Sequence, residues 1–268
     1  MSAGAHSVRI ALLGAAGRMG RAIIESAHEF PGVSIGAALV QPDSALLNQL
    51  ADRDLNYSAD LEGALTHCDV LIDFATPEAT AAALERCVAA GKPVVIGVTG
   101  LDAALQRRIE AASRKIAVLT AANMSPGVNL LLQLVRTASA ALGDAFDVEI
   151  IETHHRHKKD APSGTALALG EAVAAGRGVT LADHAVYDRA GKPAVRETGS
   201  IGFTSIRAGE IVGEHTVLLA GAGERLELTH RANSRATFAN GALAAARWLA
   251  GKPAGRYTMA DVLGLPSV

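Results

Sequence analysis

The chain of 268 residues has few cysteines, few aromatic residues and no excess of either charge. Cys68 and Cys87 are too few for a disulfide framework, and their apolar neighbours predict reduced, buried thiols. Aromatic residues make up 3% of the chain, which favours helices packed closely on a sheet over an aromatic-rich sandwich. Lys and Arg number 25 against 27 Asp and Glu, so no overall basic field exists to hold nucleic acid.

Long hydrophobic runs are also absent from the sequence. No run reaches the roughly 20 apolar residues that a membrane span needs. The first apolar stretch, Ile10 to Ala16, has no cationic segment before it, unlike a signal peptide. We therefore expect a cytoplasmic protein with no membrane partner. Apolar residues make up 49% of the chain, which excludes general disorder.

Short apolar runs alternate with helical patterns through the first 120 residues. Such runs are typical of strands buried on both faces of a parallel sheet. The alternation predicts an α/β fold with a Rossmann-like, doubly wound parallel sheet. The expected strands are Val8 to Leu13, Val33 to Leu39, Val70 to Phe74, Pro93 to Val98 and Ile116 to Thr120, and the expected helices are Arg18 to Phe30, Pro77 to Ala90 and Asp102 to Arg114.

After the first 120 residues the pattern changes to longer helices and to strands with alternating polar and apolar residues, which predicts a second α+β domain with a mixed sheet over 126–235. Thr237 to Leu249 is predicted to form an amphipathic helix, and we expect the segment 236–268 to rejoin the first domain, 1–125. The second domain is expected to contain helices Gly127 to Leu142 and Ser163 to Ala175, and strands Asp147 to Thr153, Ser200 to Arg207, Ile211 to Ala220 and Arg225 to Arg231.

A glycine-rich turn, Gly14-Ala15-Ala16-Gly17-Arg18-Met19-Gly20, joins the first strand to the first helix. Glycine lets the backbone approach a pyrophosphate, and a helix start offers N–H groups. The turn predicts dinucleotide binding, the alternative being an ordinary strand-to-helix turn. The nicotinamide end is expected at two further strand ends, unless these are also ordinary turns: Gly97, Val98, Thr99 and Gly100, and Ala121, Ala122, Asn123 and Met124.

The preference between NADH and NADPH stays open. Val40 and Gln41 hold the place where the fingerprint usually has an acidic residue for the adenine ribose, and Asp43 comes slightly later. No arginine stands beside them in sequence to receive a 2′-phosphate.

A basic cluster, His154 to Lys159, is the second feature that indicates chemistry. It follows a strand and precedes a helix start at Pro162 and Ser163, where the N–H groups of Gly164 and Thr165 favour an anion. The alternative is a solvated basic loop. Cations and a helix start at one place suit a small carboxylate ligand. No metal is expected, because Arg156, Lys158 and Lys159 would repel a divalent cation.

His154 and Lys158 are four residues apart, a spacing that puts two side chains on one face of a strand or helix. A lysine among cations is a better proton donor. Hydride delivery to an unsaturated carbon requires such a donor. The other histidines are expected at the surface or in packing: His6, His28, His67, His184, His215 and His230.

The segment 149–166, EIIETHHRHKKDAPSGTA, resembles the signature of the 4-hydroxy-tetrahydrodipicolinate reductase (dihydrodipicolinate reductase) family. The resemblance covers nearly the whole chain. It also includes Gly14 to Gly20, Ile72 to Phe74, Ala121 to Met124, Gly199 to Phe203, Arg207 to His215 and Thr237 to Gly241. Two departures stand out: Val40-Gln41 replaces an acidic residue followed by arginine, and Val98 replaces a threonine.

The resemblance implies reduction of a cyclic imine dicarboxylate by NADH or NADPH, on the diaminopimelate route to lysine. It implies that the first domain binds the cofactor through Gly14 to Met19, Gly97 to Thr99 and Ala121 to Met124. The second domain would bind substrate and assemble a homotetramer. His154 would be the acid/base residue, Lys158 the proton donor, and His155, Gly164 and Thr165 the holders of the substrate carboxylates. The alternatives are a dehydrogenase of another amino dicarboxylate and a dinucleotide sensor without turnover.

Overall fold

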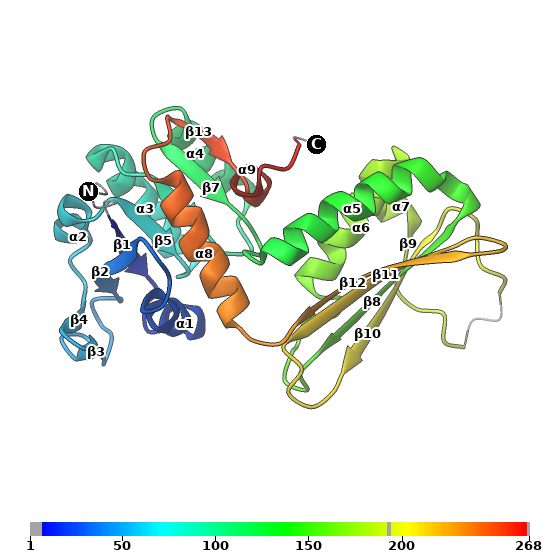
Figure 1. Cartoon of the computed structure of the whole chain (residues 1–268), viewed down its shortest axis with the longest axis horizontal. Coiled ribbons are helices and arrows are strands. Elements are labelled where there is room, and N and C mark those ends of the chain that lie inside the picture. The colour runs from blue at the N-terminus through cyan, green and yellow to red at the C-terminus, as the bar shows by residue number, and fades with distance from the viewer. Residues whose placement is uncertain (1–6, 192–193, 267–268) are drawn as a thin grey trace, which may run out of the picture. The chain divides into compact units, whose positions relative to one another are not determined.

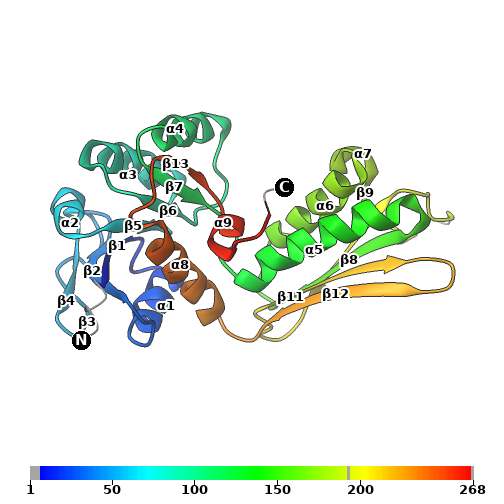
Figure 2. The same cartoon turned by 45° about the horizontal axis from the view of Figure 1, so that its top comes forward.

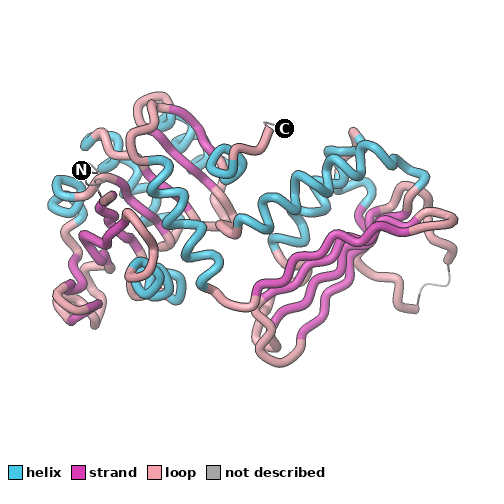
Figure 3. The backbone as a smooth tube through the Cα atoms, viewed as in Figure 1, coloured by secondary structure: helices cyan, strands magenta, loops and turns pink. Residues whose placement is uncertain are grey.

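The computed structural model describes residues 7–191 and 194–266, which form two compact units. Unit 1 contains the chain up to Pro126 together with the segment from Arg235 onward, and unit 2 contains Gly127–Ser234. Each unit has its own sheet (Figures 1 and 3). Apolar side chains form one core on each face of the unit 1 sheet and a further core in unit 2. No helix within the described ranges is long and apolar enough to cross a membrane.

Unit 1 is built on an eight-stranded sheet in the order β13-β7-β6-β5-β1-β2-β4-β3. Its strands pair in parallel except for β3 with β4, as the continuous apolar runs predicted. The strands are β1 (Val8–Leu13), β2 (Val33–Leu39), β3 (Leu50–Asp52), β4 (Leu55–Ser58), β5 (Val70–Asp73), β6 (Val94–Ile96), β7 (Ala117–Thr120) and β13 (Gly255–Tyr257).

Helices cover both faces of this sheet, which confirms the doubly wound fold. One core joins the sheet to α1 and α8, which pack against each other, and a second core joins it to α2, α3 and α4 (Figure 2). Helix α8, from the C-terminal part of the chain, packs on this first sheet. The helices are α1 (Arg18–Ala27), α2 (Leu61–His67), α3 (Pro77–Ala90), α4 (Ala103–Ser113), α8 (Ala236–Leu249) and α9 (Met259–Leu263).

Local signals fix where several helices of unit 1 begin and end. Asp102 caps α4 by accepting a hydrogen bond from the Leu105 N–H at 2.7 Å. Pro77 occupies the first position of α3, where its missing N–H costs nothing. That helix ends at Gly91 in the left-handed conformation, with φ of 64°.

Unit 2 contains a five-stranded mixed sheet in the order β12-β11-β8-β10-β9. Strand β8 pairs antiparallel with β11 and parallel with β10. Helices α5 and α6 share its core (Figure 2). The elements are α5 (Pro126–Leu142), a short 3-10 turn (Gly143–Ala145), β8 (Asp147–His154), α6 (Gly164–Arg177), α7 (Leu181–His184), β9 (Ala185–Val186), β10 (Ile201–Arg207), β11 (Gly213–Ala220) and β12 (Arg225–Ala232).

Strand β8 alternates strictly between a buried and a half-exposed face. Val148 and Ile150 on the buried face join the core that α5 and α6 complete. The same face continues with Glu152 and His154, so the strand ends by burying two ionisable side chains. Burial of such groups requires partners, which the neighbouring strands supply.

Several short elements were not expected from the sequence: β3, β4, α2, β13, α9, α7 and β9. They span two to seven residues, too few for a periodic pattern to develop. Strand β13 shows the physical reason, since it exists through pairing with β7, whose residues lie about 140 positions earlier.

Candidate active site

The glycine-rich turn between β1 and α1 is closed by backbone contacts. The N–H groups of Gly14 and Ala15 both donate to the Leu39 carbonyl at 3.1 Å. Gly14 has φ of +80°, and a Cβ there would lie 2.7 Å from the Phe74 carbonyl oxygen. A Cβ at Gly20 would lie 2.3 Å from the Gly14 oxygen, so the helix can approach the turn only without a side chain. These glycines give the turn the tight cradle that a pyrophosphate needs.

A cavity of about 860 Å³ opens beside this turn, at the carboxyl ends of β1, β2 and β5. Gly14, Ala16 and Gly17 line it, together with the segment Val40 to Ser44. Helix α1 begins at Arg18, and its N-cap Gly17 has no side chain to occupy the first N–H groups. Arg18 is exposed, Met19 is half-buried and Ala15 is fully buried, so Ala15 can reach a ligand only through its backbone.

Arg86 of α3 also lines this cavity, which corrects the sequence-based expectation about arginine. No arginine follows Val40 and Gln41 in sequence, yet the sheet order brings α3 to the same edge. The exposed Arg86 guanidinium pairs with Glu62. Asp43 lines the same cavity, so a cation and a carboxylate both contribute to its lining.

The two other glycine- and alanine-containing turns meet at a cavity of about 300 Å³ in unit 1. Its lining includes Val98 and Thr99 after β6 and Ala121 and Ala122 after β7. A Cβ at Gly97 would lie 2.3 Å from the Phe74 ring. The Asn123 Oδ1 accepts a hydrogen bond from the Ser125 N–H at 2.9 Å, and Met124 is buried in the core.

In unit 2, Glu152 and His154 form a buried pair at the end of β8. The exposed fractions are 1% for Glu152 and 8% for His154, and Glu152 Oε2 lies 2.5 Å from His154 Nδ1. Burial favours a higher pKa for Glu152, but hydrogen bonds from Arg207, Ser205 and His154 outweigh it and lower the pKa to about 2. The carboxylate is therefore ionised at neutral pH.

Arg207 at the end of β10 holds the Glu152 carboxylate with both ends of its guanidinium. Nη1 donates to Oε2 at 2.8 Å and Nη2 donates to Oε1 at 2.7 Å. The parallel register makes Arg207 the direct partner of His154 across the ladder. The Arg207 Nη2 also donates to the Asp160 carbonyl at 2.6 Å, so the same side chain ties down the loop after β8.

His215 of β11 completes the polar cluster from the other side. Its ring lies 5.1 Å from the His154 ring in an edge-on arrangement, and its Nε2 lies 3.0 Å from Ser163 Oγ. Burial first, and then the neighbouring His154, lower the pKa of His215 to about 3, so the ring is neutral at physiological pH. Burial is also the largest influence on His154 and lowers its pKa, Glu152 opposes this, and Lys158 and Arg207 add to it.

The basic loop begins where β8 ends, at His154. The Lys158 N–H donates to the His155 carbonyl at 3.1 Å, which forms a turn, and the Lys158 amine pairs with Asp160 at 2.9 Å. The segment is therefore neither strand nor helix, and the four-residue spacing does not itself bring His154 and Lys158 together. The two groups lie within electrostatic range of each other, since the Lys158 charge is one of the influences that lower the pKa of His154.

Helix α6 begins at Gly164, directly after this loop. Its N-cap Ser163 accepts a hydrogen bond from the Ala166 N–H at 3.1 Å, as its position in the sequence predicted. The first N–H groups of any helix have no acceptor within the helix, and the helix dipole adds positive potential there. The His155 Nδ1 is buried without a hydrogen-bond partner among the described residues. The arrangement suits an anionic ligand.

Sequence reasoning missed three members of this cluster as functional candidates: Glu152, Arg207 and His215. Glu152 and Arg207 stood in the motifs that carry the family resemblance, but nothing local shows that they meet. His215 was expected at the surface or in packing, and it is buried against His154. His6 lies outside the described residues. Among the described residues, no group of three His, Cys, Asp or Glu is arranged to hold a metal ion.

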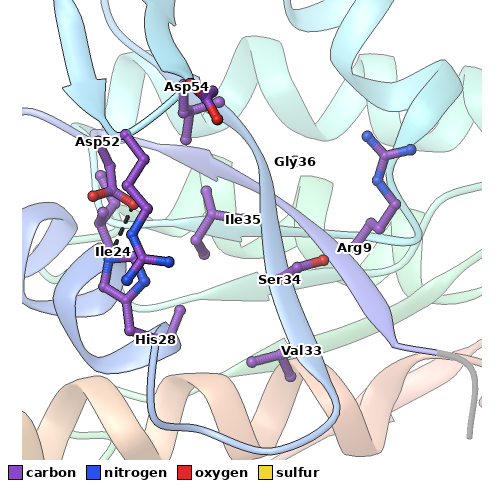
Figure 4. Close-up of a pocket in the computed structure, with 12 residues that line it drawn as sticks. Arg9, Ile24, His28, Val33, Ser34, Ile35, Gly36, Asp52 and Asp54 are labelled. Atoms are coloured by element: carbon purple, nitrogen blue, oxygen red, sulfur yellow. Dashed lines mark ion pairs between the residues drawn. The ribbon is translucent and has the colours of Figure 1, made fainter.

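A separate cavity of about 540 Å³ lies near the amino ends of β1 and β2 (Figure 4). An ion pair between His28 and Asp52, at 3.0 Å, stands on one side of it, and Arg9 lies on the other. Its lining contains none of the predicted site residues that the structure describes. The glycine-rich turn lies at the opposite, carboxyl-terminal edge of the sheet, where ligands of such sheets bind.

Comparison with known proteins gives one consistent result over almost the whole chain. Family models described as "Dihydrodipicolinate reductase, N-terminus" and "Dihydrodipicolinate reductase, C-terminus" match residues 8–124 and 127–263. The 4-hydroxy-tetrahydrodipicolinate reductase of Alkalilimnicola ehrlichii is 53% identical over 97% of this chain and 100% of its own length. That of Thiobacillus denitrificans is 51% identical over 97% and 99%. A solved structure, a dipicolinate-bound dihydrodipicolinate reductase from Paenisporosarcina sp. TG-14, shares the fold with a TM-score of 0.76 and 23% identity, over 95% of this chain and 98% of that one.

Proposed function

The chain belongs to the dihydrodipicolinate reductase family, and from this premise we propose that it reduces 4-hydroxy-tetrahydrodipicolinate to tetrahydrodipicolinate. Family membership makes it an NAD(P)H-dependent oxidoreductase of lysine biosynthesis through diaminopimelate. The observation that carries this function is the match of both family models, together with more than half identity to curated reductases. The reaction adds one hydride and one proton and releases the ring hydroxyl as water.

His154 and Lys158 carry the proton chemistry in this proposal. The bound coenzyme supplies the hydride, and the Lys158 ammonium supplies the proton that the reduced ring takes up. The buried His154 imidazole acts as the acid/base group beside it. The pairing of Lys158 with Asp160 supports this role, because the carboxylate fixes the position of the amine.

The substrate carboxylates are held by His155, Gly164 and Thr165. Support comes from the N-terminus of α6, which starts at Gly164, and from the His155 Nδ1, which makes no hydrogen bond within the part of the chain that the structure describes. A dianionic ring gains from both the helix dipole and the surrounding cations of the loop.

The coenzyme is held in unit 1 by three turns at the carboxyl edge of the sheet. The fit rests on the cradle at Gly14 and Gly20, which any Cβ would fill. In this proposal the pyrophosphate lies on the backbone of the first turn, and the nicotinamide end lies on the other two. The contributing residues are Gly14, Ala15, Ala16, Gly17, Arg18 and Met19, then Gly97, Val98 and Thr99, and finally Ala121, Ala122, Asn123 and Met124.

Both NADH and NADPH are accepted in this proposal, through two different side chains of the large cavity. Asp43 accepts hydrogen bonds from the hydroxyls of the adenine ribose of NADH, and Arg86 receives the 2′-phosphate of NADPH. The two residues would together replace the acidic residue and arginine that the chain lacks at Val40 and Gln41.

The homotetramer stays a proposal, assembled through unit 2. Support comes from apolar side chains that its sheet leaves exposed, Ile206 on β10 and Leu226 on β12. Light scattering of the purified protein tests it, and a monomer would contradict it. A cytoplasmic location remains a prediction from the sequence.

A coupled assay tests the activity. Aspartate semialdehyde, pyruvate and the synthase that condenses them generate the substrate, and absorbance at the reduced-nicotinamide band follows its consumption. We expect oxidation of NADH and NADPH only when all components are present. Oxidation with another amino dicarboxylate instead would favour a related dehydrogenase, and coenzyme binding without oxidation would favour a sensor.

A further inference from the structure

Three strands of unit 2 supply the side chains around His154. Glu152 lies on β8 with His154, Arg207 on β10 holds the Glu152 carboxylate, and His215 on β11 lies beside the His154 ring. Glu152 is the only carboxylate within hydrogen-bond distance of the His154 ring among the contacts of the described residues. Its two oxygens are both engaged by Arg207, which prevents the carboxylate from rotating. A bidentate pair of this kind fixes geometry as well as charge.

An ionised carboxylate is an acceptor only, and the lowered pKa of Glu152 keeps it ionised. The proton between the two groups therefore belongs to His154 Nδ1. This leaves Nε2 as the nitrogen that can take up or release a proton during a reaction. The arrangement is that of a histidine whose tautomer and ring orientation are set by a carboxylate behind it.

Arg207 is also linked to Lys158, through Asp160. Its Nη2 donates to the Asp160 carbonyl, and the Asp160 carboxylate pairs with the Lys158 amine. One guanidinium thus connects the carboxylate behind His154 with the loop that carries Lys158. Arginine suits this position because its fork makes several fixed bonds, which a lysine cannot.

We propose that Glu152 and Arg207 are positioning residues that fix His154 as the Nδ1-protonated tautomer and hold the Lys158 loop in place. The inference rests on the proposed function for the reaction served, but the tautomer can be measured without turnover. Neither residue touches the reacting atoms in this proposal. Both act through His154 and Lys158.

The groups that face the His154 ring set the direction of the expected pH effect. Glu152 on its own strand raises its pKa, whereas Arg207 on β10 and Lys158 in the loop lower it. His215 on β11 faces the ring and is neutral. Removing the Glu152 charge leaves only the lowering influences, so the titration of His154 moves to lower pH.

The test compares Glu152→Gln with Glu149→Gln in the full-length protein. Glu149 lies on the opposite face of β8 and is also ion-paired, with Arg189 and Arg196, so it is a matched control. We expect Glu152→Gln to lower kcat about 10- to 100-fold, by analogy with the loss that follows removal of a group orienting a metal-binding histidine. Its KM for coenzyme stays unchanged, and the Glu149→Gln variant behaves as wild type.

Nuclear magnetic resonance titration of the His154 ring gives a readout independent of turnover. We expect an Nδ1-protonated ring in the wild type and a lower pKa in Glu152→Gln. A wild-type kcat and an unchanged titration in that variant would overturn the inference. If wild-type protein shows no substrate-dependent oxidation, the proposed function fails, while the titration still decides the positioning role.

Arg207→Lys provides a second variant in case Glu152→Gln does not fold. It keeps the positive charge but cannot make both hydrogen bonds to the Glu152 carboxylate, so we expect reduced kcat with unchanged coenzyme affinity. Wild-type kcat in Arg207→Lys would overturn the part assigned to Arg207.

Discussion

Gly213 lies directly against the imidazole of His154. A Cβ atom at position 213 would stand 3.0 Å from His154 Nε2 and 3.3 Å from Cδ2. The start of β11 therefore limits the movement of the His154 ring on one side, and the hydrogen bond from Nδ1 to Glu152 fixes the ring on another. The imidazole can occupy this position because residue 213 has no side chain.

The substitution Gly213→Ala should displace the His154 ring. The contact requires the ring to move by a few tenths of an ångström. Because a shift of about 1 Å at a reacting group can cost roughly 100-fold in rate, we expect kcat to fall by up to about tenfold. Steady-state kinetics with NADPH measures this. Gly223→Ala is the control, since a Cβ there meets nothing within 4 Å. Equal activity of the two variants would show that the ring tolerates the added methyl group.

The substitution Gly17→Val should weaken coenzyme binding. A Cβ at Gly17 already approaches the Gly14 oxygen at 3.2 Å, and the branched side chain would crowd the proposed pyrophosphate position. Fluorescence titration with NADPH measures the dissociation constant, and Gly223→Val controls for added bulk elsewhere. An undiminished NADPH affinity in Gly17→Val would refute the role of the turn.

The substitution Arg86→Ala should separate the two coenzymes. Loss of a charge-assisted bond to the 2′-phosphate predicts about tenfold weaker NADPH binding, with NADH binding unchanged. Calorimetry with each coenzyme measures both affinities. Arg108→Ala is the control, because Arg108 is another surface arginine, paired with Glu85, that does not line the cavity. Equal losses for NADH and NADPH would contradict recognition of the phosphate by Arg86.

The Glu152 carboxylate should make the free energy of unfolding depend on pH in the acidic range. Although burial opposes it, hydrogen bonding lowers the pKa from 4.5 to about 2 in the folded protein. The stabilisation is therefore complete above pH 4.5 and is lost as pH falls toward 2. Thermal unfolding followed by circular dichroism across this range should show a smaller loss in Glu152→Gln than in wild type. Parallel curves for the two proteins would argue against an ionised, hydrogen-bonded Glu152.

The sequence predicted those parts of the fold and candidate site that depend on local signals. The apolar runs gave β1, β2, β5, β6 and β7, and Ser163 marked the start of α6 because an N-cap is a short-range interaction. The packing of α8 on the first sheet was implied by the family resemblance, because its apolar face alone does not show which sheet it covers. The short elements were missed because tertiary pairing, rather than periodicity, forms them.

The missed site residues share a different cause. Arg207 and His215 approach Glu152 only through the register of β10 and β11 with β8, and one-dimensional spacing does not contain that register. Arg86 is 45 positions from Gln41 and meets the same cavity through the strand order. Conversely, the spacing of His154 and Lys158 suggested a shared face of a regular element, whereas a turn joins them.

The most direct test of the account compares Lys158→Ala with Lys159→Ala in the coupled assay. The two lysines are sequence neighbours in the same basic loop, so both variants remove one positive charge from it. If Lys158 donates the proton, Lys158→Ala loses about 100-fold or more in kcat and keeps wild-type NADPH affinity, while Lys159→Ala keeps a kcat close to that of the wild type. Wild-type turnover in Lys158→Ala, or equal losses in both variants, would contradict the account.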